Sequence, residues 1–319
     1  MACASLGCRE QVPYCGRVRF NPRADISGGH VTDVRGGGGG GGLGNIPMGA
    51  ISGGGIGTTI LVIIIYLIVQ FAGGGGGGLG PAGPEETTDR YDRCLTGADA
   101  NKSEDCARRA VEASLEAYWS KVLPQQTGKQ LQPTQVKTFT DATSTACGNA
   151  TKDVGPFYCP NDQTIYLDTT FFKDVLEGQL GGKGGDFVEP YVIGHEFGHH
   201  IQNLLGTMSR VRTQQGPTSD SVRLELQADC YAGMWTRGAT GTTDSRGVQI
   251  FAAIDDHDIT EALDAAKDVG DDYIQRRGGG DVNPEQWTHG SSEQRMRWFT
   301  TGYNATDINQ CDTFSTNNL

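Results

Sequence analysis

The sequence predicts an α+β domain, mainly helical with a small sheet, preceded by a glycine-rich tail and one transmembrane helix. Three observations predict this class. Two capped segments near the middle of the chain have apolar residues at helical spacing, one shorter segment alternates like a strand, and one apolar run lies between two runs of glycine. We therefore expect four parts, namely a tail at 1–55, a transmembrane helix at 56–72, a linker at 73–88 and a domain at 89–319.

Glycine and charge are unevenly distributed. Of 319 residues 48 are glycine, and the runs Gly36–Gly42 and Gly73–Gly78 have no triplet period, which excludes a collagen-like chain. The net charge is −12, and residues 1–50 contain five arginines and only three acidic residues, so the excess of negative charge lies downstream. An acidic domain argues against a nucleic-acid partner, because binding would require a basic face to displace phosphate counterions.

The apolar run Ile56–Ala72 predicts a membrane-spanning helix. As a helix its seventeen residues would rise about 26 Å, and no charged residue lies between Gly36 and Pro84. A buried pair of strands or a cleaved signal peptide would have a similar composition, but the flanking glycines offer no packing surface and no small-residue cleavage site follows. Arginines precede the run and acidic residues follow it, which predicts a cytoplasmic N-terminus and an extracytoplasmic domain.

The cysteines agree with an oxidising compartment. Six lie after the apolar run, and we hypothesise the pairs Cys94–Cys106, Cys147–Cys159 and Cys230–Cys311 among fifteen possible connectivities. Three more lie within the first seventeen residues. Because a valine codon can serve as a bacterial start, we expect residues 1–17 to be a start-site artefact, with Val18 as the natural first position.

Two segments define the expected secondary structure before the central motif. Residues 88–123 have apolar side chains at three-and-four spacing, which predicts helix. Residues 155–168 alternate and contain Thr164–Asp168, which predicts a strand.

The central motif is HExxH, on a helix expected from Asp186 to Gly206. Asp186 and Glu189 have the spacing of a capping box at its start. His195 and His199 are four residues apart and so lie on one helix face, where both can bind one Zn²⁺. Glu196 lies beside them, and its expected role is to accept the proton of a water whose pKa zinc lowers to about 7.

A second capped helix, expected from Ser219 or Asp220 to Gly238, contains ExxxD. Glu225 is the expected third ligand, and Asp229, one turn later on the same face, can accept the free ring N–H of a ligand histidine. The alternative is that both carboxylates form a solvated acidic edge. The apolar neighbours of this pair along the helix disfavour exposure.

Several stretches together resemble the bacterial neutral zinc metallopeptidases described as putative, which are membrane-anchored relatives of the glutamate-type zincins. The matching stretches are RFNPRADISGGHVTD, GPFYCPNDQTIYLD, YVIGHEFGHHIQNLLG, ELQADCYAGMW and HGSSEQRMRWF. The resemblance covers nearly all of the chain from Val18 to Cys311. It implies a zincin-like fold and peptidase activity, with His195, His199 and Glu225 as ligands and Glu196 as the base.

The expected reaction is hydrolysis of a peptide bond outside the cytoplasm. By resemblance to zincins, an extended substrate would lie antiparallel to an edge strand above the motif helix, and Thr164–Asp168 is the expected edge. His289 is a candidate for stabilising the oxyanion, although a structural role next to the Ser291 helix cap is the alternative. Two other functions stay open: an inactive zincin scaffold that binds an envelope partner, and a zinc hydrolase of non-peptide amides.

Overall fold

The computed structural model describes residues 18–35 and 87–319. The strands are β1 Arg19–Phe20, β2 Val31–Asp33, β3 Gln135–Phe139, β4 Ala142–Thr145, β5 Gly148–Thr151, β6 Phe157–Cys159, β7 Thr164–Asp168 and β8 Phe251–Ala253. The α-helices are α2 Gly97–Ala100, α3 Glu104–Thr127, α4 Val188–Leu205, α5 Asp220–Gly238, α6 Asp256–Asp268, α7 Asp271–Arg277 and α8 Ser292–Asn304. A π-helix, η2, spans Phe172–Gln179, and the 3₁₀ turns are η1 Lys152–Val154, η3 Met208–Arg210, η4 Ala239–Gly241, η5 Pro284–Gln286 and η6 Ile308–Cys311.

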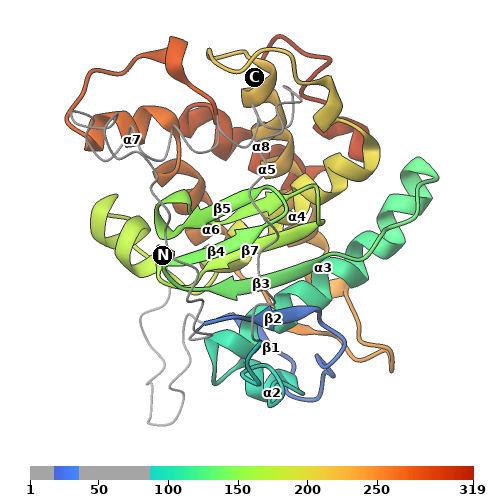
Figure 1. The fold of residues 1–319 in the computed structure, drawn as a ribbon. Coiled ribbons are helices and arrows are strands. Elements are labelled where there is room, and N and C mark those ends of the chain that lie inside the picture. Colours follow the sequence, from blue (N-terminus) through green and yellow to red (C-terminus); the bar gives the residue numbers. More distant parts are fainter. Residues whose placement is uncertain (1–17, 36–86) are drawn as a thin grey trace, which may run out of the picture.

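A four-stranded mixed sheet lies at the centre of this part of the chain. Its order is β2-β3-β7-β6, in which β2, β3 and β7 are parallel and β6 is antiparallel to β7. Figure 1 shows β3 and β7 side by side, with β1, β2 and α2 on one side of them and α5, α7 and α8 on the other. The mixture of a small sheet with many helices is the α+β class that the sequence predicts.

Residues 18–35 are part of the folded domain, so the expected boundary between tail and domain is wrong for this segment. β1 pairs with β8, and β2 pairs with β3 along Val31↔Val136, Thr32↔Lys137 and Asp33↔Thr138. Phe20 and Ile26 are buried in the main core. Strands of two and three residues whose partners lie more than a hundred residues away leave no local pattern that separates them from a tail.

The described flanks of residues 36–86 meet at one place. Asp33 accepts the backbone N–H of Thr88 at its carbonyl oxygen, 2.8 Å, and the Thr88 hydroxyl at its carboxylate. The predicted orientation, with the residues before 56 in the cytoplasm, does not fit this packing, because a strand hydrogen-bonded to β3 lies on the same side of a membrane as β3. The predicted span at 56–72 and the predicted artefact at 1–17 lie outside the described residues. Within 18–35 and 87–319, none of the helices combines the length and the apolar character that crossing a membrane requires.

The helices differ from their expected bounds in two places. The segment expected to be helical from residue 88 forms turns and the short helix α2 first, and α3 begins only at Glu104 and continues through Pro124 to Thr127. α4 begins at Val188 without the capping box, because Asp186 instead accepts the backbone N–H of Val18 and Glu189 pairs with Arg108. Both carboxylates of the expected capping box therefore make tertiary contacts in place of the cap.

Close helix packing brings the site elements together. A Cβ at Gly198 of α4 would meet Ala228 of α5 at 3.0 Å, and a Cβ at Gly302 of α8 would lie 1.8 Å from the carbonyl oxygen of Cys230. Only glycine permits the second approach. The hypothesised disulfides Cys94–Cys106, Cys147–Cys159 and Cys230–Cys311 are all confirmed, and the third ties α5 to the C-terminal segment.

Candidate metal centre

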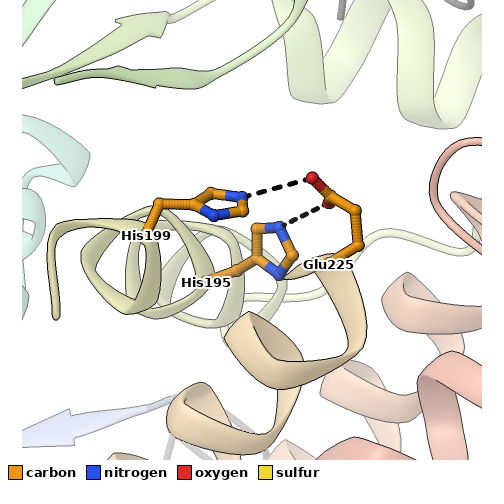
Figure 2. Close-up of side chains that lie close together, drawn as sticks. All are labelled: His195, His199 and Glu225. Atoms are coloured by element: carbon orange, nitrogen blue, oxygen red, sulfur yellow. Dashed lines mark hydrogen bonds and ion pairs between the residues drawn. The ribbon is translucent and has the colours of Figure 1, made fainter. Parts of the chain in front are cut away.

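The two histidines of HExxH lie on one face of α4. Their ring centroids are 4.8 Å apart, and the planes are nearly perpendicular at 87°. Both side chains are buried, and their Nε2 atoms point toward α5 (Figure 2). The i, i+4 spacing therefore produces the juxtaposition that the sequence predicts.

Glu225 of α5 places its carboxylate against both rings. Oε2 lies 3.2 Å from His195 Nε2, and Oε1 lies 3.5 Å from His199 Nε2. Zinc bonds of about 2.1 Å at a tetrahedral angle would separate neighbouring ligand atoms by about 3.4 Å. The three residues, all buried, thus have the chemistry and the spacing of a zinc site.

Asp229 fixes the orientation of His195. Its Oδ1 lies 2.8 Å from His195 Nδ1, which is the contact expected from the ExxxD spacing. When Nδ1–H donates to this carboxylate, the lone pair of Nε2 faces the position between the ligands.

Arg295 and Tyr191 hold Asp229 in turn, and sequence reasoning missed Arg295. Its Nε donates to Asp229 Oδ2 at 2.8 Å and its Nη2 to Oδ1 at 2.9 Å, while the Tyr191 hydroxyl donates to Oδ1 at 2.7 Å. One signal was present: Arg295 lies three and four residues before Trp298 and Phe299, on the buried face of α8. A buried arginine requires a carboxylate partner.

Gln202 orients His199, and this role was also missed. Its Oε1 lies 2.8 Å from His199 Nδ1. Its Nε2 donates to Leu224 O at 2.7 Å and to Gln227 Oε1 at 3.1 Å. Two acceptors on the nitrogen side fix which end of the amide faces His199, so Nδ1 is the donor and Nε2 is left for a metal.

The charges around the ligands suit a cation. Burial raises the pKa of Glu225, but His199 and His195 outweigh it and the pKa is lowered. Burial likewise opposes ionisation of Asp229, yet Arg295 and His195 lower its pKa to about 2. Burial lowers the pKa of His195, but Asp229 and Glu225 raise it to about 10, so a proton competes with a metal for this ring.

Glu196 lies in the same cleft and takes no part in the ligand contacts. It is buried on α4 between the two histidines in sequence, and burial raises its pKa. A carboxyl whose pKa is raised can both accept and return a proton near neutral pH. This is the property expected of the predicted base.

His289, predicted from the sequence as a candidate for stabilising the oxyanion, lines this cleft too. Asp271 holds it: Oδ1 lies 3.1 Å from His289 Nδ1, and Oδ2 accepts the backbone N–H groups of Thr288, His289 and Gly290. Burial lowers the pKa of His289, but Asp271 and Glu225 outweigh it and the pKa is raised. Asp271 therefore holds the His289 ring in one orientation, and the raised pKa favours the protonated ring. His200 lies elsewhere, bonded to Tyr158 and the carbonyl of Gln132.

The expected edge strand is wrong. β7, which is Thr164–Asp168, lies inside the sheet between β3 and β6. β6 is the edge strand next to β7, and its Phe157 and Tyr158 line the cleft together with His195, His199 and Glu225. The cleft has a volume of about 670 Å³ and apolar walls that include Phe171, Val192 and Leu224. Strand order follows from tertiary pairing, which alternation in the sequence does not encode.

Comparison with known families agrees with this geometry. The family described as putative neutral zinc metallopeptidase matches residues 21–314. The chain belongs to this family. The match begins before β2, in keeping with the place of residues 21–35 in the folded domain.

Relatives of the chain occur in Mycobacterium and in Escherichia coli. The uncharacterized proteins Rv2575 of Mycobacterium tuberculosis and Mb2605 of Mycobacterium bovis are each 48% identical over 229 residues, which cover 71% of this chain and 76% of theirs. The uncharacterized protein YpfJ of Escherichia coli is 40% identical over 210 residues, covering 64% of this chain and 69% of its own. No solved structure gives a significant match. Membership of the family implies zinc, which the ligand spacing fits.

Proposed function

We propose that the protein is a zinc-dependent peptidase that hydrolyses peptide bonds outside the cytoplasm. The observation that carries the proposal is the convergence of His195, His199 and Glu225 within zinc-ligand distance, in a cleft that also contains Glu196. Family membership supports the same reaction class.

Glu196 is the proposed base. Zinc, when bound, supplies a Lewis acid for the scissile carbonyl and lowers the pKa of a water to about 7. Glu196 accepts a proton from the attacking water and delivers it to the departing amine, and its raised pKa suits both transfers. Asp229 and Gln202 keep the ligand rings in place during these steps.

His289 is the proposed donor to the oxyanion. Its Nδ1 is occupied by Asp271 and Thr288, so Nε2 is the ring nitrogen left for the cleft. The raised pKa favours a protonated Nε2, which can donate to an oxygen that becomes negative in the transition state.

The proposed substrate is an extended peptide with apolar side chains. β6 is an unpaired edge of the described sheet beside the cleft, and an extended peptide can add to such an edge through main-chain hydrogen bonds. The apolar walls of the cleft favour apolar side chains next to the scissile bond.

The domain is proposed to act outside the cytoplasm, held at the membrane by 56–72, which would enter the bilayer without crossing it because the segments on both sides of it belong to the domain. Three disulfides in one domain favour an oxidising compartment. Because residues 18–35 pair with the domain, this segment is proposed to lie on the domain's side of the membrane. Fusion of a periplasmic reporter enzyme before Val18 and after Leu319 tests this, and activity at only one end would contradict it.

Digestion of a peptide library by the purified full-length protein tests the function. We expect cleavage that a chelator stops and zinc restores. Glu196→Gln should retain zinc and lose turnover, whereas His195→Ala or Glu225→Ala should lose both. Full activity of Glu196→Gln would refute its role as base.

The two alternatives give different results in the same experiment. A scaffold that binds a partner would yield no products and little zinc in the wild-type protein. A hydrolase of non-peptide amides would bind zinc, yield no peptide products and still require Glu196. Neither outcome is expected.

A further inference from the structure

A second group of potential metal ligands lies outside the cleft, on elements that contribute none of the catalytic ligands. His30 immediately precedes β2, and Glu112 and Glu116 lie one turn apart on α3. The helical spacing of four places both carboxylates on the face of α3 that meets the segment before β2.

The side-chain atoms of these residues converge. His30 Nδ1 lies 3.0 Å from Glu116 Oε2 and 3.9 Å from Glu112 Oε1, and one ligand atom from each residue fits within 4.8 Å of the other two. Neighbouring ligands of a tetrahedral zinc would be about 3.4 Å apart, between these two distances.

Glu112 is a buried carboxylate, and one of its two oxygens accepts no hydrogen bond from the described residues. The residue is 0% exposed, and its Oε2 accepts the backbone N–H of His30 at 2.6 Å. Its Oε1 has no hydrogen-bond partner among the described residues, and it is the oxygen that faces the His30 ring. An unpartnered buried carboxylate oxygen is costly, and a bound cation would remove that cost.

The nearest arginine does not fill this role. Arg109 directs its guanidinium to the backbone carbonyls of Gly29, Tyr91, Cys94 and Ser27. In the described part of the chain, one oxygen of each carboxylate and Nδ1 of the half-exposed His30 lie within 4.8 Å of one another.

Protonation of Glu112 is the alternative to a cation. Burial and the neighbouring Glu116 raise the pKa of Glu112 to about 8. The neutral acid would still lack an acceptor for a proton on Oε1. Protonation thus removes the charge without satisfying the group.

We propose that His30 Nδ1, Glu112 Oε1 and Glu116 Oε2 form a second divalent-cation site, of the zinc type. One imidazole and two carboxylates suit zinc or a similar transition ion. The half-exposed side of His30 leaves room for a water as a fourth ligand. The site is structural: it joins the segment before β2 to α3, where a Cβ on Gly29 would lie 2.5 Å from the carbonyl oxygen of Arg109.

Zinc content of the full-length protein tests the site. After dialysis against micromolar Zn²⁺, elemental analysis should find two zinc ions per wild-type chain. The double variant His195→Ala/Glu225→Ala should retain one, and adding Glu112→Gln should remove it. A double variant without zinc would overturn this second site and leave the proposed peptidase intact, whereas wild-type zinc that survives the double variant in full would refute the catalytic ligands.

Thermal unfolding gives a second readout. In the His195→Ala/Glu225→Ala background, Zn²⁺ at 100 times its Kd should lower the unfolding equilibrium constant about 100-fold. Adding Glu116→Gln, which removes a partly exposed ligand and leaves the buried carboxylate, should abolish the zinc response. Glu104→Gln on the same helix, 90% exposed, is the control and should leave it unchanged. An equal response in the Glu116 and Glu104 variants would overturn the site.

Discussion

Replacing Gln202 by leucine should lower zinc affinity although none of the proposed zinc ligands is changed. The substitution keeps the side-chain size and leaves His195, His199 and Glu225 in place. It removes the amide that accepts from His199 Nδ1 at 2.8 Å and donates to Gln227 Oε1 at 3.1 Å.

The magnitude follows from these contacts. Loss of the group that orients a ligand histidine costs about 10- to 100-fold in zinc affinity. Three buried polar groups lose a hydrogen bond, namely the His199 ring N–H, Gln227 Oε1 and Leu224 O, but Leu224 O keeps its bond within α5. At about 1–3 kcal/mol for each of the other two, the free energy of unfolding should fall by about 2–6 kcal/mol. Gln202→Glu should keep most of the zinc affinity, because a carboxylate still accepts from Nδ1, but it cannot donate to Leu224 O and should lower stability.

Competition for zinc with a coloured chelator measures the affinity, and urea unfolding measures the stability. Asn203→Leu is the matched control, since Asn203 follows on the same helix and bonds to the Tyr158 hydroxyl, away from the ligands. We expect this control to bind zinc as the wild type does. Wild-type affinity in Gln202→Leu would refute the orienting role.

Four other outcomes are expected. Asp229→Asn should weaken zinc binding by about 10- to 100-fold in the same competition assay. His289→Ala should lower kcat for peptide cleavage by about 100- to 1,000-fold with zinc content unchanged, and equal loss of zinc would contradict its role as a donor. Replacing both Cys230 and Cys311 by serine opens a bridge across 81 residues and should lower the free energy of unfolding by about 4–5 kcal/mol, measured in urea. The raised pKa of Glu112 makes a contribution to stability that is fully present below about pH 4.5 and is lost as the pH rises through about 8. With a chelator present to remove metal, the urea concentration at the midpoint of unfolding should therefore decrease as the pH is raised from about 6 to 9 in the wild type, and decrease less in Glu112→Gln.

The site ligands could be predicted because helical spacing encodes them. His195 and His199 share one helix face, and Glu225 and Asp229 share another, so each pair is fixed by the chain itself. The approach of the two faces depends on α4 packing against α5, which was indicated by the apolar neighbours of Glu225 and by the family resemblance. Arg295 and Gln202 act across helices, and no spacing rule links them to their partners.

The predicted strand was correct in type and wrong in place. Thr164–Asp168 is β7, but its position inside the sheet depends on β6 and β3, which pair with it on either side. The disulfides were predictable because two of them close short loops, whose ends are close in any compact chain.

The place of residues 18–35 determines how a soluble form of this protein should be designed. A fragment that starts at Thr87 would lack β2, so the edge of β3 that pairs with β2 would have no partner strand. An unpaired strand edge promotes aggregation. Since Thr88 hydrogen-bonds to Asp33, a short polar connector from Arg35 to Thr87 would retain every strand of the described residues while omitting the apolar run.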